Sequence, residues 1–147
     1  MKLILLSGPS KCGKTTTFNK LQEKLISELG GTKLHYEQIN NSKDFQSVIK
    51  INDKQIAVFS MGDLKNECIK AILKYLGVDI LILAYNNHFA VGLFEEVPLK
   101  LVYTEVTGAE PPAHVIVDME KKETDEEKTI EEERMLSEII AELKKSL

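Results

Sequence analysis

Residues 7–17 read SGPSKCGKTTT, and they follow the apolar run MKLILL at residues 1–6. The glycines at positions 8 and 13 allow a tight turn in which successive backbone N–H groups point at one anion. A segment with helical periodicity follows directly, and the N-terminus of a helix attracts negative charge. The stretch therefore predicts a phosphate-binding loop between a buried strand and a helix.

Residues 8–15 match the pattern G-x-x-x-x-G-K-[ST] at every fixed position. In this pattern the lysine reaches the β- and γ-phosphates of a nucleotide, and the hydroxyl group of the last residue ligates Mg²⁺. Lys14 and Thr15 occupy those two positions. Lys11 is a further positive charge that either touches phosphate or stays in solvent. The predicted nucleotide-binding residues are Gly8, Pro9, Ser10, Lys11, Cys12, Gly13, Lys14, Thr15 and Thr16.

With this loop and its flanking strand and helix, the chain resembles the P-loop NTPase superfamily, whose fold would cover essentially all 147 residues. The opening Ser-Gly-Pro-Ser is similar to loops of nucleotide kinases of the guanylate kinase kind. Partition-type ATPases carry an extra lysine where this chain has Pro9, which disfavours that subclass. The wider pattern also resembles small ATP-binding P-loop proteins of bacteria and their mobile elements, a resemblance that implies no particular substrate.

Short apolar runs alternate with segments of helical periodicity along the chain. This alternation predicts one α/β domain at residues 1–147, with three layers, a mostly parallel central sheet and a β-hairpin around residues 52–54. Thr124 and Glu127 form a capping box at the start of the last helix, whose apolar face belongs to the core or, as the alternative, to a dimer. Strands are expected at residues 3–6, 34–39, 45–51, 55–59, 79–85, 99–106 and 114–118, and helices at residues 14–29, 64–76 and 124–146.

P-loop enzymes also need a carboxylate at the end of a strand to hold or orient the magnesium shell. Asp63 follows the strand expected at residues 55–59, and we assign it to the metal site together with Thr15. Asp63 also stands where the N-cap of the next helix belongs, and both roles can coexist. Asp118, at the end of the strand expected at residues 114–118, is the alternative carboxylate, with Glu120 two residues on.

Asn86 follows the apolar strand expected at residues 79–85. A side-chain amide at this place can sense the γ-phosphate or hold the attacking water, whereas the alternative is a simple turn, which Asn-Asn sequences favour. The predicted catalytic residues are therefore Lys14, Asp63 and Asn86.

A missing guanine-binding motif and a scarcity of arginine limit which nucleotide and which reaction the sequence supports. Guanine-specific P-loop proteins carry N-K-x-D after a late strand, and the NSKD at residues 41–44 has the wrong spacing and comes too early, so ATP is expected by elimination. Small-molecule kinases clamp phosphoryl groups with several arginines, whereas Arg134 is the only arginine here. We expect a slow, Mg²⁺-dependent ATPase that acts as a switch. The alternatives are a small-molecule or nucleotide kinase with a short lid between Asn86 and Pro98, and a non-hydrolysing nucleotide sensor that acts through a protein partner.

The composition indicates which other binding partners are expected. The net charge is −4, and residues 120–133 alone contribute −5, because they hold eight acidic residues and three lysines. This acidic segment is expected to be a solvated helix start rather than a partner surface. Without a basic stripe interleaved with aromatic residues, nucleic-acid binding is not expected. The apolar runs are too short for a membrane span, and two distant cysteines, Cys12 and Cys68, indicate a reducing cytoplasm. Beyond nucleotide, a protein partner or a homodimer remains open.

Overall fold

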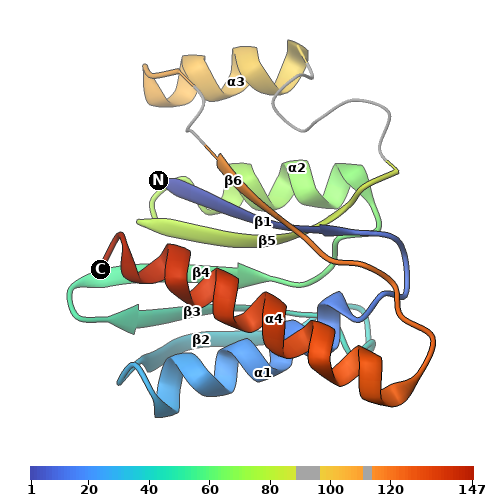
Figure 1. The fold of residues 1–147 in the computed structure, drawn as a ribbon. Coiled ribbons are helices and arrows are strands. Elements are labelled where there is room, and N and C mark those ends of the chain that lie inside the picture. The colour runs from blue at the N-terminus through green and yellow to red at the C-terminus, as the bar shows by residue number, and fades with distance from the viewer. Residues whose placement is uncertain (89–96, 111–113) are drawn as a thin grey trace.

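The computed structural model describes residues 1–88, 97–110 and 114–147. The chain alternates between strands and helices, as the periodicity predicts (Figure 1). Its elements are β1 (Lys2–Gly8), α1 (Lys14–Ser27), β2 (Thr32–Gln38), β3 (Phe45–Ile51), β4 (Lys54–Phe59), α2 (Lys65–Lys74), β5 (Ile80–Asn86), α3 (Val97–Thr107), β6 (His114–Asp118) and α4 (Asp125–Lys144).

The six strands form one mixed sheet in the order β2-β3-β4-β5-β1-β6. β1 runs parallel to both of its neighbours, β5 and β6, and β4 runs parallel to β5. β3 is antiparallel to both of its neighbours, β2 and β4. A two-residue loop, Asn52–Asp53, connects β3 to β4. The mostly parallel α/β architecture and the hairpin expected from the sequence are therefore confirmed.

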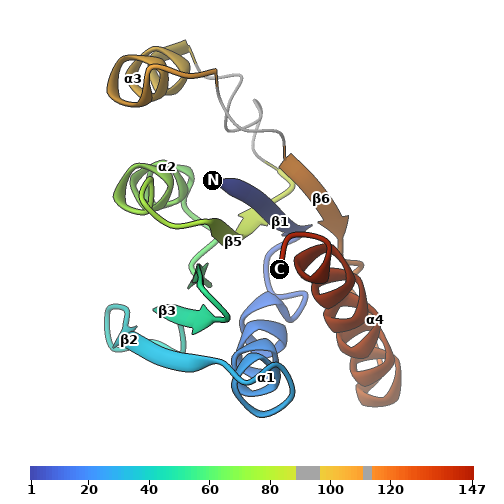
Figure 2. The same cartoon turned by 90° about the vertical axis from the view of Figure 1, so that its left-hand side faces the viewer.

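Helices cover both faces of the sheet, with α1 and α4 on one side and α2 and α3 on the other (Figure 2). A separate apolar cluster lies on each face, and β1 contributes to both because its side chains alternate: Leu6 packs on the α1/α4 side and Leu5 on the α2/α3 side. Both side chains are almost fully buried, as in a parallel strand covered on two faces. Among the described residues, no helix has the length and apolar character needed to cross a membrane.

One expected strand is wrong. Residues 99–106 include several β-branched or aromatic residues, which favour strands, yet they lie in the helix α3. The topology gives the reason: β5 and β6 are parallel and lie on opposite sides of β1, so the chain between them must cross one face of the sheet, usually as a helix. Tyr103 anchors α3 to the α2-side cluster, whereas Leu101 and Val106 remain about two-thirds exposed, at 64% and 63%.

The ends of the other helices follow their sequence signals. α1 stops before Gly30, which has a left-handed φ of 69°, and the Gly31 amide donates to the Leu25 carbonyl. The Thr124 side chain accepts a hydrogen bond from the Glu127 amide, as the capping box predicts. The apolar face of α4 belongs to the core, because Met135, Leu136, Ile139 and Leu143 are all buried there.

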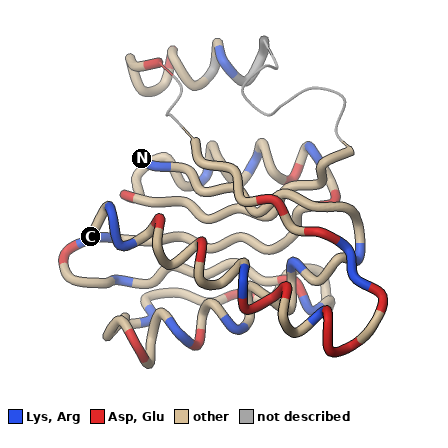
Figure 3. The backbone as a smooth tube through the Cα atoms, viewed as in Figure 1, with Lys and Arg blue, Asp and Glu red and all other residues tan. Residues whose placement is uncertain are grey.

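The acidic segment lies at the start of α4 and faces α1 rather than solvent alone (Figure 3). Glu132 pairs with Lys20, and Glu133 lies 3.9 Å from Lys24. Asp125 and its two acidic neighbours occupy the first turn of α4, where they oppose the positive end of the helix dipole. Much of the negative charge of this segment therefore pairs with lysines of α1 or stabilises the N-terminus of α4.

Glu131 ties the loop before α4 to the helix itself. Its carboxylate is only 4% exposed, accepts a hydrogen bond from the Glu120 amide at 2.7 Å and pairs with the Arg134 guanidinium at 2.8 Å. The hydrogen bonds from Arg134 hold the pKa of Glu131 below its ordinary value, although burial opposes the shift. Arg134 also donates to Glu138 and to the Asp118 carbonyl.

We predict that Glu131→Gln lowers the free energy of unfolding by about 1–3 kcal/mol at neutral pH, because a buried charge-assisted contact is lost. A carboxyl with a lowered folded-state pKa stabilises the fold above the ordinary pKa, and that contribution disappears as pH falls through the lowered value. Urea denaturation of both proteins across the acidic range measures the difference, which should shrink with acidification. Glu138→Gln is the matched control, since Glu138 contacts the same arginine but is 46% exposed; an equal loss in the control would contradict the prediction.

Candidate functional site

The loop between β1 and α1 wraps closely against the chain that follows β6. A Cβ atom on Gly8 would lie 2.8 Å from the Cys12 sulfur and 3.0 Å from the Met119 carbonyl oxygen. Gly13 has a φ of 108°, a conformation that side-chain-bearing residues rarely adopt. The Met119 amide also donates to the Ser7 carbonyl at 2.7 Å. Both motif glycines are therefore required by the local geometry.

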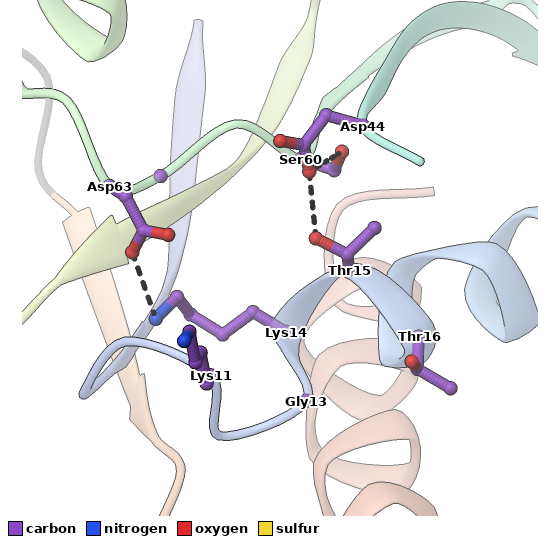
Figure 4. Close-up of a pocket in the computed structure, with 9 residues that line it drawn as sticks. Lys11, Gly13, Lys14, Thr15, Thr16, Asp44, Ser60 and Asp63 are labelled. Atoms are coloured by element: carbon purple, nitrogen blue, oxygen red, sulfur yellow. Dashed lines mark hydrogen bonds and ion pairs between the residues drawn. The ribbon is translucent and has the colours of Figure 1, made fainter. Parts of the chain in front are cut away.

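Lys14 lies under this loop and is only 6% exposed. Its Nζ atom donates hydrogen bonds to the carbonyl oxygens of Gly8 at 2.9 Å and Pro9 at 2.8 Å. The same atom lies 3.9 Å from a carboxylate oxygen of Asp63 (Figure 4). The predicted phosphate-binding ammonium group is thus held at the pocket by loop carbonyls and faces one of the predicted acidic residues.

Thr15 faces a different carboxylate. Its hydroxyl donates to Asp44 Oδ1 at 2.7 Å, and the Ser60 hydroxyl donates to the same oxygen at 3.1 Å. The Phe45 amide in turn donates to the Ser60 hydroxyl at 2.9 Å, which fixes that side chain at the end of β4. A hydroxyl group and a carboxylate oxygen are thereby placed together at the first turn of α1.

Asp44 was not predicted, because it precedes a strand and the polar residues assigned from the sequence all follow strands. Ser60 directly follows the strand expected at residues 55–59, but Asp63 was assigned there instead because a carboxylate was expected. β3 is antiparallel to β4, and Gln46 is paired with Phe59, so the start of β3 lies beside the end of β4. The residue before β3 therefore reaches the same sheet edge as the residues after the parallel strands. The predicted hairpin was the signal that could have identified Asp44.

Asp63 is linked to Asn86 as well as to Lys14. The Asn86 side-chain amide donates to Asp63 Oδ1 at 3.3 Å, and the Asn86 side-chain oxygen accepts from the His88 amide at 2.9 Å. Asn86 is buried, whereas the Asp63 side chain is 57% exposed. Leu64, not Asp63, is the N-cap residue of α2, and no side chain caps that helix, so the alternative capping role of Asp63 is not observed.

One pocket of about 320 Å³ contains most of the predicted residues. Asn86 contacts Asp63 but does not line the pocket. Asp118 and Glu120 are exposed at the end of β6, on the side of β1 opposite β5, and do not line the pocket either. Of the lid predicted between Asn86 and Pro98, residues 89–96 lie outside the described residues. The lining residues are Lys11, Gly13, Lys14, Thr15, Thr16, Asp44, Ser60, Gly62 and Asp63.

The oxygen atoms at Thr15 and Asp44 suit a magnesium ion. Mg²⁺ prefers oxygen ligands and commonly uses one or two protein groups together with substrate phosphates. Within the described parts of the chain, no group of three or more His, Cys, Asp or Glu side chains could hold a metal ion by itself. The donor set therefore fits a metal that arrives with a phosphate ligand.

Cys12 is a structural part of the loop. Burial raises the pKa of its thiol, although the nearby Lys14 ammonium opposes this shift. Cys68, on α2, is buried more deeply, and desolvation raises its pKa to about 12. Both cysteines are free thiols that stay protonated at neutral pH, which makes them poor nucleophiles.

Comparison with known families agrees with this geometry. The model of the Rad17 P-loop domain matches residues 1–127, which include the loop, the pocket and every strand of the sheet. No curated protein matches the chain.

We predict that Gly8→Ala disrupts the loop, because the added methyl group would overlap the Cys12 sulfur and crowd the Met119 carbonyl. Overpacking of this kind costs about 1–3 kcal/mol. Thermal denaturation should show a lower melting temperature, and the affinity for nucleotide should fall as well. Gly77→Ala is the control, since nothing lies within 4 Å of a Cβ at that position. A Gly8→Ala protein as stable as the control would contradict the close approach described above.

Proposed function

The chain belongs to the Rad17 P-loop domain family, and from that premise we propose that it binds a nucleoside triphosphate, ATP in the first instance, with Mg²⁺ and hydrolyses it slowly as a switch. One observation carries the proposal. Lys14 and Thr15 are adjacent in sequence at the start of α1, and in one pocket each faces a different carboxylate, Asp63 and Asp44 respectively. This arrangement separates a phosphate-binding cation from a metal-binding hydroxyl group.

The phosphates would occupy the turn of the loop. Its backbone N–H groups and the N-terminus of α1 provide a positive potential there. Lys14 already holds its ammonium group between two loop carbonyls, so little side-chain freedom is lost when it contacts a phosphate oxygen. Lys11 and Thr16 line the open side of the pocket and are exposed, so both can approach a bound phosphate.

Thr15 and Asp44 are the best candidates for the magnesium side of the pocket. When bound, Mg²⁺ neutralises the charge that develops on the transferred phosphoryl group. The Thr15 hydroxyl would ligate the ion, and Asp44, supported by Ser60, would accept hydrogen bonds from its water shell. At the metal site that the sequence predicts for Thr15 and Asp63, this proposal therefore puts Asp44 in the place of Asp63.

Asp63 is better suited to the water that attacks the γ-phosphate. It lies on the Lys14 side of the pocket, and its exposed carboxylate is held by the buried Asn86 amide. We propose that Asp63 orients this water and that Asn86 positions Asp63. Asn86 is then a positioning residue rather than a group that touches the nucleotide.

The arrangement of charge favours slow turnover. An arginine that stabilises the transition state is worth about 10³ to 10⁵ in rate in P-loop NTPases. Arg134 is the only arginine in the chain, and it is bound to Glu131 and Glu138 on α4. No described residue that lines the pocket is an arginine. Faster hydrolysis would therefore need a cation from another protein.

We expect Lys14→Ala to weaken ATP binding by about 10- to 100-fold, because charge-assisted hydrogen bonds to phosphate are lost. Titration calorimetry with Mg-ATP measures the effect, and Lys54→Ala, at an exposed hairpin position, is the control. Unchanged affinity in Lys14→Ala would overturn the proposed function.

The reaction can be tested with the purified chain, Mg-ATP and a panel of nucleosides and nucleotides. Phosphate release without any acceptor is the expected result for a slow ATPase. ADP formation that depends on one acceptor would identify a kinase instead, and binding without turnover would identify a nucleotide sensor.

The two carboxylates give different predictions. Asp44→Asn should raise the Mg²⁺ concentration needed for half-maximal ATP binding by about tenfold, since a charged partner of the metal shell is lost. Asp63→Asn should slow phosphate release while leaving the Mg²⁺ requirement unchanged. Asp53→Asn, in the Asn52–Asp53 loop, is the control for removal of a carboxylate. A shift of the Mg²⁺ requirement in Asp63→Asn alone would return the metal role to Asp63.

A further inference from the structure

β2 is an open edge of the sheet. Among the described strands it pairs with β3 alone, and all seven of its residues are exposed. The strand contains neither proline nor glycine, and Leu34 and Tyr36 are exposed at 50% and 46%. An edge strand of this kind presents unpaired backbone N–H and C=O groups, to which another strand can pair.

The direction of these backbone groups follows from the β2–β3 register. The Ile39 amide donates to the Asp44 carbonyl across the hairpin, and Gln38 is paired with Phe45 in the next position. Backbone groups of successive residues point alternately to the two sides of a strand. The N–H and C=O groups of Tyr36 and Gln38 therefore point away from β3, to the free side of β2.

We propose that two copies of the chain pair through their β2 strands, antiparallel and about a two-fold axis at Tyr36. Tyr36 of each copy then exchanges two backbone hydrogen bonds with its counterpart, because its N–H and C=O groups face outward. The contact is self-complementary, as a two-fold interface must be. The two sheets join into one that continues from one protomer to the other.

The side chains of β2 fit this register. With Tyr36 on the axis, His35 of one copy lies opposite Glu37 of the other, and the same pair recurs by symmetry. Within one copy these two side chains already lie on the same face, with 3.5 Å between His35 Nε2 and Glu37 Oε2. A histidine ring can donate a hydrogen bond to the carboxylate opposite it, and this register places no like charges opposite each other, an arrangement that would destabilise the contact.

Tyr36 is held in place for such a contact. Its ring stacks on the buried Phe45 with centroids 5.4 Å apart, and the Lys33 ammonium lies 4.9 Å from the ring centroid. A stacked ring on a rigid strand loses little freedom when it is buried by a partner. Two such rings would lie side by side at the axis, on the α1 face of the sheet.

A bulge limits the length of the contact. The β2–β3 register shifts between Lys33 and His35, so Leu34 is the extra residue. Regular pairing therefore extends over His35, Tyr36 and Glu37 of each copy, and it ends at both sides where Gln38 of one copy lies opposite Leu34 of the other. We infer a second copy rather than an unrelated peptide, because the pairing of His35 with Glu37 is then formed twice, once on each side of the axis.

The register can be tested by disulfide cross-linking. Directly opposed residues in a hydrogen-bonded antiparallel pair have Cα atoms about 5.5 Å apart, within the range of a disulfide. Tyr36→Cys should therefore form a covalent dimer under mild oxidation, and the native cysteines are buried. In Glu37→Cys the two introduced thiols are displaced along the strands by more than about 7 Å between Cα atoms, so little cross-linking is expected. Equal cross-linking of both variants, or of neither, would overturn the proposal.

The mass in solution provides a second test. One chain has a mass of 16.6 kDa, so the dimer has twice that mass, 33.2 kDa. Sedimentation equilibrium should show the wild type approaching the dimer mass as concentration rises. Tyr36→Lys should stay at 16.6 kDa, because two ammonium groups would meet at the axis, while ATP binding confirms that it is folded. Ile130→Lys, at an exposed position of α4, is the control and should dimerise. A wild type that remains monomeric at its highest soluble concentration would refute the pairing.

Discussion

The position of β1 between two parallel strands is the constraint on which the rest of the structure depends. Because β5 and β6 flank β1 in register, its carboxyl end lies between the carboxyl ends of two parallel strands. The loop that leaves this strand is enclosed by the chain after β5 and the chain after β6. The Asn87 amide contacts the Gly8 carbonyl from one side, and the Met119 amide contacts the Ser7 carbonyl from the other. The phosphate loop is thus shaped by both neighbours of its own strand.

The loop, its helix and the alternating architecture could be predicted from the sequence, because each depends on local signals. Glycine spacing, the capping box at Thr124 and the apolar runs all act over a few residues. The helix α3 was mistaken for a strand because residues 99–106 include several residue types that favour strands, whereas its conformation is imposed by the crossing from β5 to β6. Asp44 escaped prediction for a related reason: its place in the pocket depends on the pairing of β3 with β4. Non-local pairing decided both cases.

The pocket balances its own charge. Lys14 is close to Asp63, and Thr15 donates to Asp44, so both of these side chains already have a carboxylate partner. An entering phosphate must compete with these contacts, and a metal ion relieves the repulsion between phosphate and carboxylates. The arrangement gives a physical reason for binding nucleotide and metal together.

The turn between β2 and β3 connects the edge of the sheet to the pocket. From Ile39 to Asp44 it is held by four hydrogen bonds, two of them made by the Ser42 hydroxyl. The carboxylate beside Thr15 is consequently fixed by the length of this turn. Added residues there would release Asp44, whereas residues added at the Asn52–Asp53 loop, at the opposite end of β3, would leave the pocket untouched. A protein engineer who wishes to graft a reporter or a second module onto this chain should therefore choose the far hairpin.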